Sequence, residues 1–219
     1  MKTIQFAGKS LILDASGVLL WPEREIAVVA DLHLEKATYF AQQGQLLPPQ
    51  ESRETLSKLR ATLDRVGCRS LILLGDSFHD AEGFDRLNSH ARQLWEQICK
   101  TYAVTFVVGN HDGLFVPPNT QGADCLELEG ITFRHQAIKG ALAEISGHYH
   151  PKASLKLRGS RITRPCFIAD TKRIILPAFG TLTGGMDVHS REIAALFSTD
   201  YTVHLLGEGK VYSVPARSI

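Results

Sequence analysis

Several features that define other classes of protein are scarce in this sequence. Its four cysteines are scattered and no two form a CxxC pair, which argues against a zinc finger and against a disulfide framework. Neither sign of charge predominates, because 24 Lys and Arg residues stand against 23 Asp and Glu residues. The sequence therefore excludes a polyelectrolyte partner that is recruited by bulk charge alone.

Long hydrophobic runs are also missing. No apolar stretch approaches the roughly 18 residues of a membrane span, and Lys9 and Ser10 interrupt the first apolar segment. We therefore expect a cytoplasmic protein with no membrane partner. The hydrophobic content of 44% still allows a sizeable core, and no stretch has the composition of a linker. We expect one domain over residues 1–219.

Apolar runs alternate with helical patterns in the first half of the chain. Strands are expected at residues 10–14, 17–21, 25–30, 70–76 and 103–108, and helices at 49–66 and 85–100. The second half changes character, because short β-type segments follow one another with few helical patterns between them. This organisation predicts an α/β fold with two sheets and with helices on the outside.

Four of the expected strands end in a cluster of Asp, Asn, Gly and His residues. The clusters are Asp31-Leu32-His33, Gly75-Asp76-Ser77-Phe78-His79, Gly109-Asn110-His111-Asp112 and Gly147-His148-Tyr149-His150. In α/β proteins, side chains that follow separate strands converge on one crevice. A single strand-end Asp is more often a turn former or a helix cap, but four clusters together favour a shared site.

The residue types in these clusters indicate a metal site. Carboxylate and amide oxygens combined with imidazoles, and without thiolates, suit divalent ions such as Mn, Fe or Zn. A glycine precedes three of the clusters, at Gly75, Gly109 and Gly147. We expect these glycines to allow a sharp turn or a close backbone approach where a Cβ would clash.

The four clusters and one isolated histidine resemble the motif series of the calcineurin-like metallophosphoesterase superfamily. That series is DxH, GDxx(H/D), GNH(D/E), a lone His and GHxH, and every member occurs here in order within residues 28–150. The GDxxH form is similar to the double-strand-break repair nucleases. The segments ADLHLEKATYF (30–40) and ILPAFGTLTGG (175–185) resemble small bacterial phosphoesterases encoded beside a DNA ligase and a helicase.

The resemblance implies a four-layer α/β/β/α sandwich of two mixed sheets and a pair of divalent ions, most simply Mn²⁺, with Fe or Zn as alternatives. It places Asp31, His33 and His150 on one ion, Asn110, His135 and His148 on the other, and Asp76 between them. His135 could equally be a partly buried histidine without a ligand role. We also expect the backbone to bend after Gly147, so that both following imidazoles point toward the ions.

The same resemblance implies three catalytic residues. His111 would protonate the leaving oxygen, and Asp112 would hold the other ring nitrogen of that histidine. Alternatively, Asp112 caps the turn and His111 is a further metal ligand. His79 would stabilise charge on the scissile phosphate. Alternatively, His79 begins a helix and has no catalytic role.

Residues 151–169 contain five Lys and Arg residues and no acidic residue. Lys156 and Arg158 are the candidate substrate contacts in this segment, because two residues that alternate on a strand share one face. A local basic run can equally be a solvated strand face. No aromatic residues are interleaved to support base stacking.

Together, the residues and the resemblance predict a dinuclear phosphodiesterase, and specifically a Mn-dependent DNA endonuclease in DNA repair. A hydroxide that bridges the two ions would attack phosphorus in line. The predicted substrate is DNA, with a functional link to a DNA ligase and a helicase. The main alternative is a small-molecule phosphoesterase or nucleotide pyrophosphatase of the same superfamily. A scaffold that has lost catalysis is disfavoured because all seven predicted ligands are present.

Overall fold

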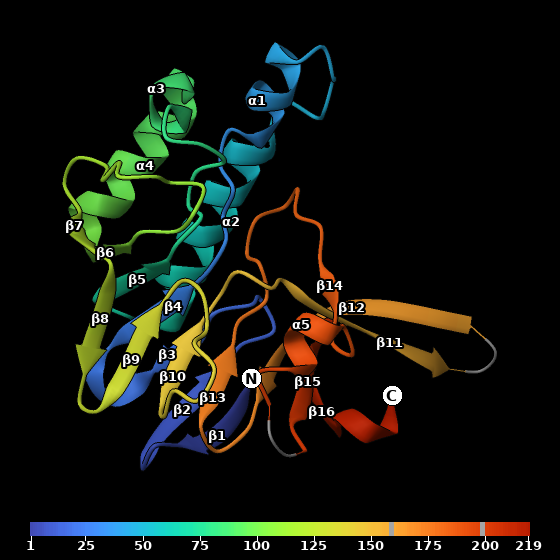
Figure 1. Ribbon diagram of the computed structural model, residues 1–219. Helices are drawn as coiled ribbons and strands as arrows, with labels where there is room; N and C mark the ends of the chain where they lie inside the picture. The colour runs from blue at the N-terminus through green and yellow to red at the C-terminus, as the bar shows by residue number, and fades with distance from the viewer. Residues whose placement is uncertain (158–159, 198–199) are drawn as a thin grey trace.

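The computed structural model describes residues 1–157, 160–197 and 200–219. Two β-sheets face each other, and the longer helices lie on the outer face of the first sheet (Figure 1). Both sheets contain parallel and antiparallel neighbours, so both are mixed. The predicted sandwich of two mixed sheets with flanking helices is therefore confirmed.

The first sheet takes its strands in chain order. They are β1 (Lys2–Phe6), β2 (Lys9–Leu13), β3 (Leu19–Trp21), β4 (Ile26–Val29), β5 (Ser70–Leu74), β6 (Ala103–Val107) and β7 (Gln121–Ala123). Short connections make β1 to β4 antiparallel, whereas the helical crossovers after β4 and β5 make the next strands parallel. Parallel strands end at the same edge, which brings the segments after β4, β5 and β6 together.

Helices α2 (Glu51–Val66) and α4 (Ser89–Thr101) cover the outer face of this sheet. Leu56, Leu59 and Leu63 of α2 are fully buried, as the spacing of apolar residues in the sequence predicts. α2 ends where Gly67 takes a left-handed conformation with φ of 70°.

Three local predictions need correction. The single helix expected over 85–100 is two helices, α3 (Gly83–Arg86) and α4, because Asn88 is extended and its side chain caps Ala91 N at 2.9 Å. Helix α1 (Lys36–Gln42) was not predicted, since seven residues are too few to show a periodic pattern. The strand expected up to His150 ends earlier, as β10 (Glu144–Ser146).

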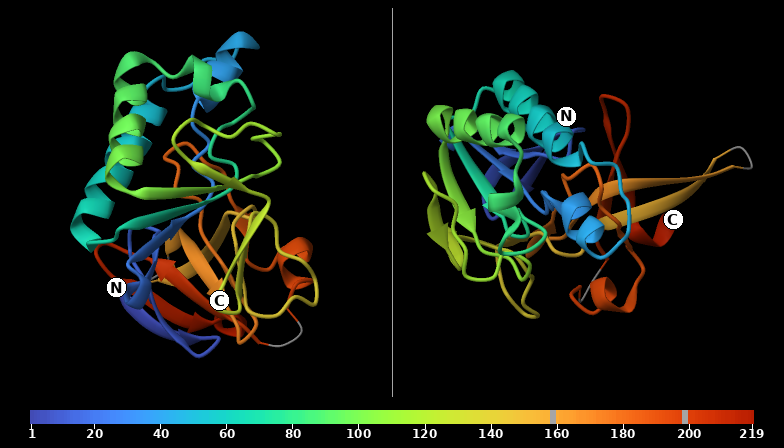
Figure 2. Two further views of the ribbon diagram at one scale, coloured as in Figure 1. Left: turned by 90° about the vertical axis from the view of Figure 1, so that its left-hand side faces the viewer. Right: turned by 90° about the horizontal axis from the view of Figure 1, so that it is seen from above.

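The second sheet contains the remaining strands in the order β14-β11-β12-β13-β10-β9-β8, with β15 paired to β12 and β16 paired to β15. Their bounds are β8 (Cys125–Leu128), β9 (Ile131–Arg134), β11 (Pro151–Leu157), β12 (Ser160–Ala169), β13 (Arg173–Ile175), β14 (Met186–Asp187), β15 (Thr202–Leu206) and β16 (Val211–Pro215). The strands β11 and β12 form a hairpin that projects from the rest of the molecule (Figure 2).

Hydrophobic side chains join these layers. Phe167 of β12 belongs to a cluster that also takes residues from the first sheet, whereas its neighbours Cys166 and Ile168 belong to a cluster with Ile193 of α5 (Arg191–Ala194). This alternation places Phe167 between the sheets and α5 on the outer side of the second sheet. Among the described residues, none of the helices combines the length and the apolar character needed to cross a membrane.

Candidate metal centre

The seven predicted ligands lie at the edge where the two sheets meet. They follow β4 (Asp31, His33), β5 (Asp76), β6 (Asn110), β9 (His135) and β10 (His148, His150). Backbone hydrogen bonds hold neighbouring segments together within each sheet: Gly147 N donates to the His135 carbonyl in the second sheet, and His33 N donates to the Asp76 carbonyl in the first, both at 2.9 Å. The structure therefore brings together residues up to 119 positions apart, from Asp31 to His150.

Asp31, His33 and His150 form the first cluster, with their donor atoms within 4.8 Å of one another. Nε2 of His150 lies 3.2 Å from Asp31 Oδ1 and 3.2 Å from Nε2 of His33. Asp31 also accepts a hydrogen bond from His148 N at 2.9 Å, which fixes its carboxylate. Asp31 is fully buried, and His33 is nearly so.

Asp76, His135 and His148 form the second cluster, with Asn110 beside it. Nε2 of His135 lies 2.9 Å from Asn110 Oδ1, 3.0 Å from His148 Nδ1 and 3.3 Å from Asp76 Oδ2. Nδ1 of His135 donates to the Leu74 carbonyl at 3.1 Å, which leaves Nε2 free to bind an electrophile. This hydrogen bond favours the ligand interpretation of His135 over that of an ordinary buried histidine.

Asp76 lies between the two clusters. Its Oδ2 is 3.3 Å from His135 Nε2 in the second cluster and 4.0 Å from His33 Nε2 in the first. Its Oδ1 accepts a hydrogen bond from His111 N at 2.9 Å. One carboxylate therefore faces both groups of donors, as a bridging ligand must.

The backbone of the site is unusual. Five of the seven predicted ligands have a positive φ: 57° at Asp31, 46° at His33, 47° at Asp76, 72° at His148 and 45° at His150. Residues other than glycine rarely adopt this left-handed conformation, and strain of this kind concentrates at functional sites. The predicted bend after Gly147 is confirmed by the last two of these angles.

All three predicted glycines allow a close approach, and a Cβ on Gly75, which has a φ of 70°, would lie 2.4 Å from His135 Nδ1. A Cβ on Gly109 would overlap the backbone nitrogen and the carboxylate of Asp76. A Cβ on Gly147 would lie 2.6 Å from both Ala30 Cβ and Asp31 Oδ2. Larger residues at the last two positions would displace the two carboxylates.

The donor set fits divalent metal ions. Two pairs of imidazole nitrogens face each other at 3.2 and 3.0 Å, and carboxylate oxygens point into the same space. Several nitrogen and oxygen donors that face one small space are the arrangement that binds a cation. Burial, reinforced by the neighbouring histidines, lowers the pKa of His33 to about 2, which keeps this imidazole neutral as a ligand must be.

The charge on Asp76 is favoured as well. Burial opposes the ionised form, but the hydrogen bond and charge of His135 and the hydrogen bond from His111 N outweigh it and lower the pKa of Asp76 to about 2. Nitrogen and oxygen donors without thiolates suit Mn²⁺, Fe²⁺ or Zn²⁺. The clusters therefore have the composition of a metal site.

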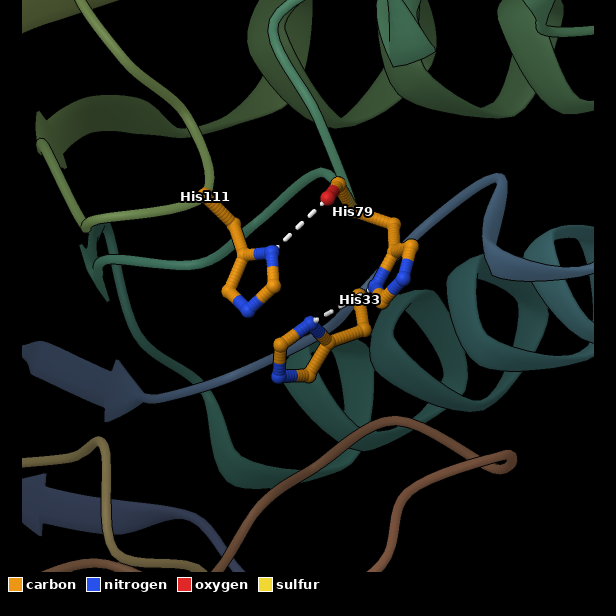
Figure 3. Close-up of side chains that lie close together, drawn as sticks. All are labelled: His33, His79 and His111. Atoms are coloured by element: carbon orange, nitrogen blue, oxygen red, sulfur yellow. Dashed lines mark hydrogen bonds between the residues drawn. The ribbon is translucent and has the colours of Figure 1, made fainter. Parts of the chain in front are cut away.

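His79 and His111 lie beside the first cluster (Figure 3). Their rings stack with centroids 4.9 Å apart, and the ring of His33 contacts both edge-on. His111 Nδ1 is 2.9 Å from the His79 carbonyl oxygen. Burial, with the charges of His111 and Lys36, lowers the pKa of His79 to about 4, so that this ring is neutral near pH 7.

Asp112 does not take the position expected of it. Its two carboxylate oxygens accept hydrogen bonds from Phe78 N and Gly109 N, each at 2.9 Å, and it is fully buried. The prediction that Asp112 holds the ring of His111 is therefore wrong, because the His79 carbonyl does so. Asp112 instead ties the segment after β6 to the segment after β5. Burial outweighs these hydrogen bonds and raises the pKa of Asp112 to about 6.

Two aromatic residues near His79 were missed from the sequence. The rings of Tyr39 and Phe40 lie 4.8 and 5.5 Å from the ring of His79. Both belong to α1, which begins three residues after His33. The aromatic pair that closely follows a metal motif is the signal that could have identified them.

Of the two predicted substrate contacts, Lys156 and Arg158, the structure describes only the backbone position of Lys156. Lys156 lies in β11, where its backbone pairs with that of Arg161 in β12. Arg158 lies outside the described residues. Arg161 and Arg164 of β12 are exposed.

Comparisons with known proteins agree with this fold. The family model for calcineurin-like phosphoesterases matches residues 24–204, and the chain belongs to this family. The predicted metal-dependent phosphoester hydrolase is thereby confirmed. No curated protein sequence matches the chain.

One solved structure is similar along almost the whole chain. It is the nuclease MPE of Pseudomonas putida, with a TM-score of 0.77 and 29% identity, over 97% of this chain and 99% of that one. A second is a conserved protein of Streptococcus pneumoniae described as a predicted phosphoesterase. It has a TM-score of 0.35 and 17% identity, over 87% of this chain and 95% of that one.

Proposed function

We propose that the protein is a metal-dependent phosphodiesterase that cleaves DNA as an endonuclease. The observation that carries this proposal is the meeting of two donor clusters at Asp76, with His79 and His111 beside them. Similarity to the Pseudomonas putida nuclease over 97% of the chain supports nucleic acid as the substrate class.

In this proposal each cluster holds one divalent ion. Asp31, His33 and His150 would hold the first ion, Asn110, His135 and His148 would hold the second, and Asp76 would be shared by both. Two such ions, when bound, acidify a water molecule and neutralise phosphoryl oxygens. We propose Mn²⁺ as the native ion, while Fe²⁺ and Zn²⁺ fit the same donors.

Two histidines would assist the reaction, one by protonating the leaving oxygen and the other by stabilising negative charge on the phosphoryl group. His111 donates through Nδ1 to the His79 carbonyl, so Nε2 is the nitrogen that exchanges a proton, and the imidazolium form passes its Nε2 proton to the leaving oxygen. The neutral ring of His79 donates a hydrogen bond to a phosphoryl oxygen and stabilises the charge that develops there. Asp112 positions the segment that carries His111 rather than contacting substrate.

The projecting hairpin supports a polymeric substrate. Arg161 and Arg164 are exposed basic residues of its described part, and we propose that Lys156 and Arg158 contact a nucleic-acid backbone. A role in DNA repair and a link to a ligase and a helicase rest on the sequence resemblance alone.

The test compares hydrolysis of bis-p-nitrophenyl phosphate, p-nitrophenyl phosphate and supercoiled plasmid, with and without Mn²⁺. The variants are Asp76→Asn, which keeps the size of the side chain, His79→Ala, and the exposed His90→Ala as a control. We expect diester and plasmid cleavage to require metal and to be lost in Asp76→Asn. His79→Ala should reduce diester cleavage more than monoester cleavage, and His90→Ala should match the wild type.

Two results would contradict the proposal. Turnover of the monoester alone would favour the small-molecule phosphoesterase. Full activity in Asp76→Asn would exclude the shared carboxylate as part of the centre. If DNA is the substrate, its binding should also weaken steeply with salt, because several phosphates are neutralised together.

A further inference from the structure

A recess opens beside the metal centre, between α1 and the loop that joins β13 to β14. It has a volume of about 400 Å³ and is lined by Lys36, Phe40 and Leu47 on one side and by residues 181–184 on the other. None of these side chains is a proposed metal ligand or catalytic residue. Its volume is in the range of pockets that hold small organic groups.

One wall of the recess is connected directly to the catalytic histidines. Phe40 lines the recess, and its ring lies 5.5 Å from that of His79. The chain after α1 folds back, because Gln45 N donates to the Phe40 carbonyl at 2.9 Å. Only the side chain of Phe40 therefore separates the recess from His79, which is proposed to contact the scissile phosphate.

The opposite wall is held to the same centre. Figure 1 shows the loop before β14 rising toward α1 and α2. Thr181 N donates to Thr55 Oγ1 of α2 at 3.1 Å, and Gly180 N donates to the carbonyl of Asp31 at 3.2 Å. Both walls are thus fixed relative to the metal ligands.

The chemistry of the lining is aromatic and cationic. Phe40, Leu47 and Leu182 supply apolar surface, and the ammonium group of Lys36 supplies positive charge. No carboxylate lines the recess among the described residues. Lys152 approaches the same loop from its other side, with Nζ 3.4 Å from the Thr183 carbonyl.

We propose that this recess binds one nucleobase of the DNA strand, adjacent to the scissile phosphodiester. Phe40 stacks on the face of the base, Leu182 closes the opposite side, and Lys36 pairs with the adjoining phosphate. This inference rests on the proposed nuclease function and specifies how that function selects its substrate.

The geometry also restricts the state of the DNA. A base inside a stacked duplex cannot enter a recess, so the bound nucleotide must be unstacked. Stacking on Phe40 tolerates every base, because each has a flat aromatic face. The recess therefore favours substrates that carry any nucleoside beside the phosphate, and it does not discriminate between base sequences.

The test uses three diesters with the same leaving group. They are the 5′- and 3′-p-nitrophenyl phosphates of thymidine, which carry a base, and methyl p-nitrophenyl phosphate, which does not. With Mn²⁺, we expect kcat/KM of the wild type to be about tenfold higher for one thymidine ester than for the methyl ester. Whichever ester is preferred identifies the side of the phosphate on which the recess lies.

Variants on the two walls separate base binding from effects on His79. Phe40→Leu should lower kcat/KM for the preferred thymidine ester about tenfold, mainly through KM, and bring it close to the methyl ester. Phe40→Trp should keep the preference. Leu182→Ala, on the wall remote from His79, should reduce the preference in the same direction. Leu46 is 91% exposed and does not line the recess, so Leu46→Ala is the matched control.

The outcomes distinguish this inference from the proposed function. Equal turnover of all three esters by the wild type would contradict the base site alone, as would an equal loss on every ester in Phe40→Leu. In the latter case Phe40 would act by packing against His79. Failure of the wild type to hydrolyse any of the diesters with Mn²⁺, Fe²⁺ or Zn²⁺ would contradict the phosphodiesterase function itself.

Discussion

Nδ1 of His111 lies 2.9 Å from the backbone carbonyl oxygen of His79. A carbonyl only accepts hydrogen bonds, so Nδ1 carries the proton in this contact, and Nε2 is the nitrogen available for proton transfer. The orientation of His111 therefore depends on the backbone at residue 79. It does not depend on the side chain of Asp112, whose two oxygens accept from Phe78 N and Gly109 N.

Replacement of His111 by Ala should slow DNA cleavage by about 10²- to 10⁴-fold, because the alkoxide leaving group then departs without a proton donor. The backbone hydrogen bond from residue 111 to Asp76 is retained in this variant. Hydrolysis of bis-p-nitrophenyl phosphate should suffer much less, since p-nitrophenolate leaves readily as an anion. An equal loss on both substrates would show that His111 does not act as the general acid.

Replacement of Asp112 by Asn should destabilise the fold by about 1–3 kcal/mol, because the amide NH₂ group would face one of two buried backbone N–H donors. Thermal or urea unfolding measures this loss, with the exposed Asp124→Asn as the control. A stable Asp112→Asn protein that loses activity as completely as His111→Ala would restore a direct catalytic role for Asp112.

Replacement of Gly109 by Ala should weaken metal binding, because the added Cβ overlaps the backbone nitrogen and the carboxylate of Asp76. Isothermal titration with Mn²⁺ measures the effect, and we expect at least a tenfold loss of affinity for one ion. A Cβ on Gly184 meets no atom within 4 Å, so Gly184→Ala is a suitable control. Unchanged metal affinity in Gly109→Ala would mean that Asp76 is not placed as described.

His204 should make the fold less stable in mild acid. It is buried, and this burial, aided by Lys2, lowers its pKa to about 4. Between about pH 6.5 and pH 4, the unfolded chain binds a proton at this residue while the folded chain does not, so stability falls as the pH falls. The loss reaches about 3 kcal/mol at most.

Urea unfolding of wild type and His204→Gln at several pH values isolates this contribution. The stability of the variant should vary less over this pH range than that of the wild type. Identical pH profiles would show that the burial of His204 does not shift its titration. His204 Nδ1 lies 2.8 Å from Ser213 Oγ, an interaction that Gln can replace.

Most of the candidate metal ligands were predictable because they follow apolar runs typical of buried strands. Val29 leads into Asp31 and Leu74 leads into Asp76, and parallel strands end at one edge of a sheet. The motif spacing then identified the family. The sequence could also indicate the close approach at Gly109, since only glycine lacks a Cβ.

Other features depend on tertiary contacts that no local pattern encodes. The left-handed backbone at His148 and His150 follows from packing against Asp31, whose carboxylate accepts from His148 N. The carboxylate of Asp112 turns toward Phe78 N because the segments after β5 and β6 are adjacent. Helix α1 is too short for a periodic pattern, so the sequence could mark the aromatic pair beside the motif but not the contact of Phe40 with the ring of His79.

The most direct test of the dinuclear centre is electron paramagnetic resonance of the Mn²⁺-loaded protein, combined with metal analysis. We expect two ions per chain and an exchange-coupled spectrum, because Asp76 faces both clusters. In His148→Ala, which lacks a donor of the second cluster only, one ion and an uncoupled six-line signal should remain. A wild-type protein that binds one Mn²⁺, or two without coupling, would contradict the shared centre.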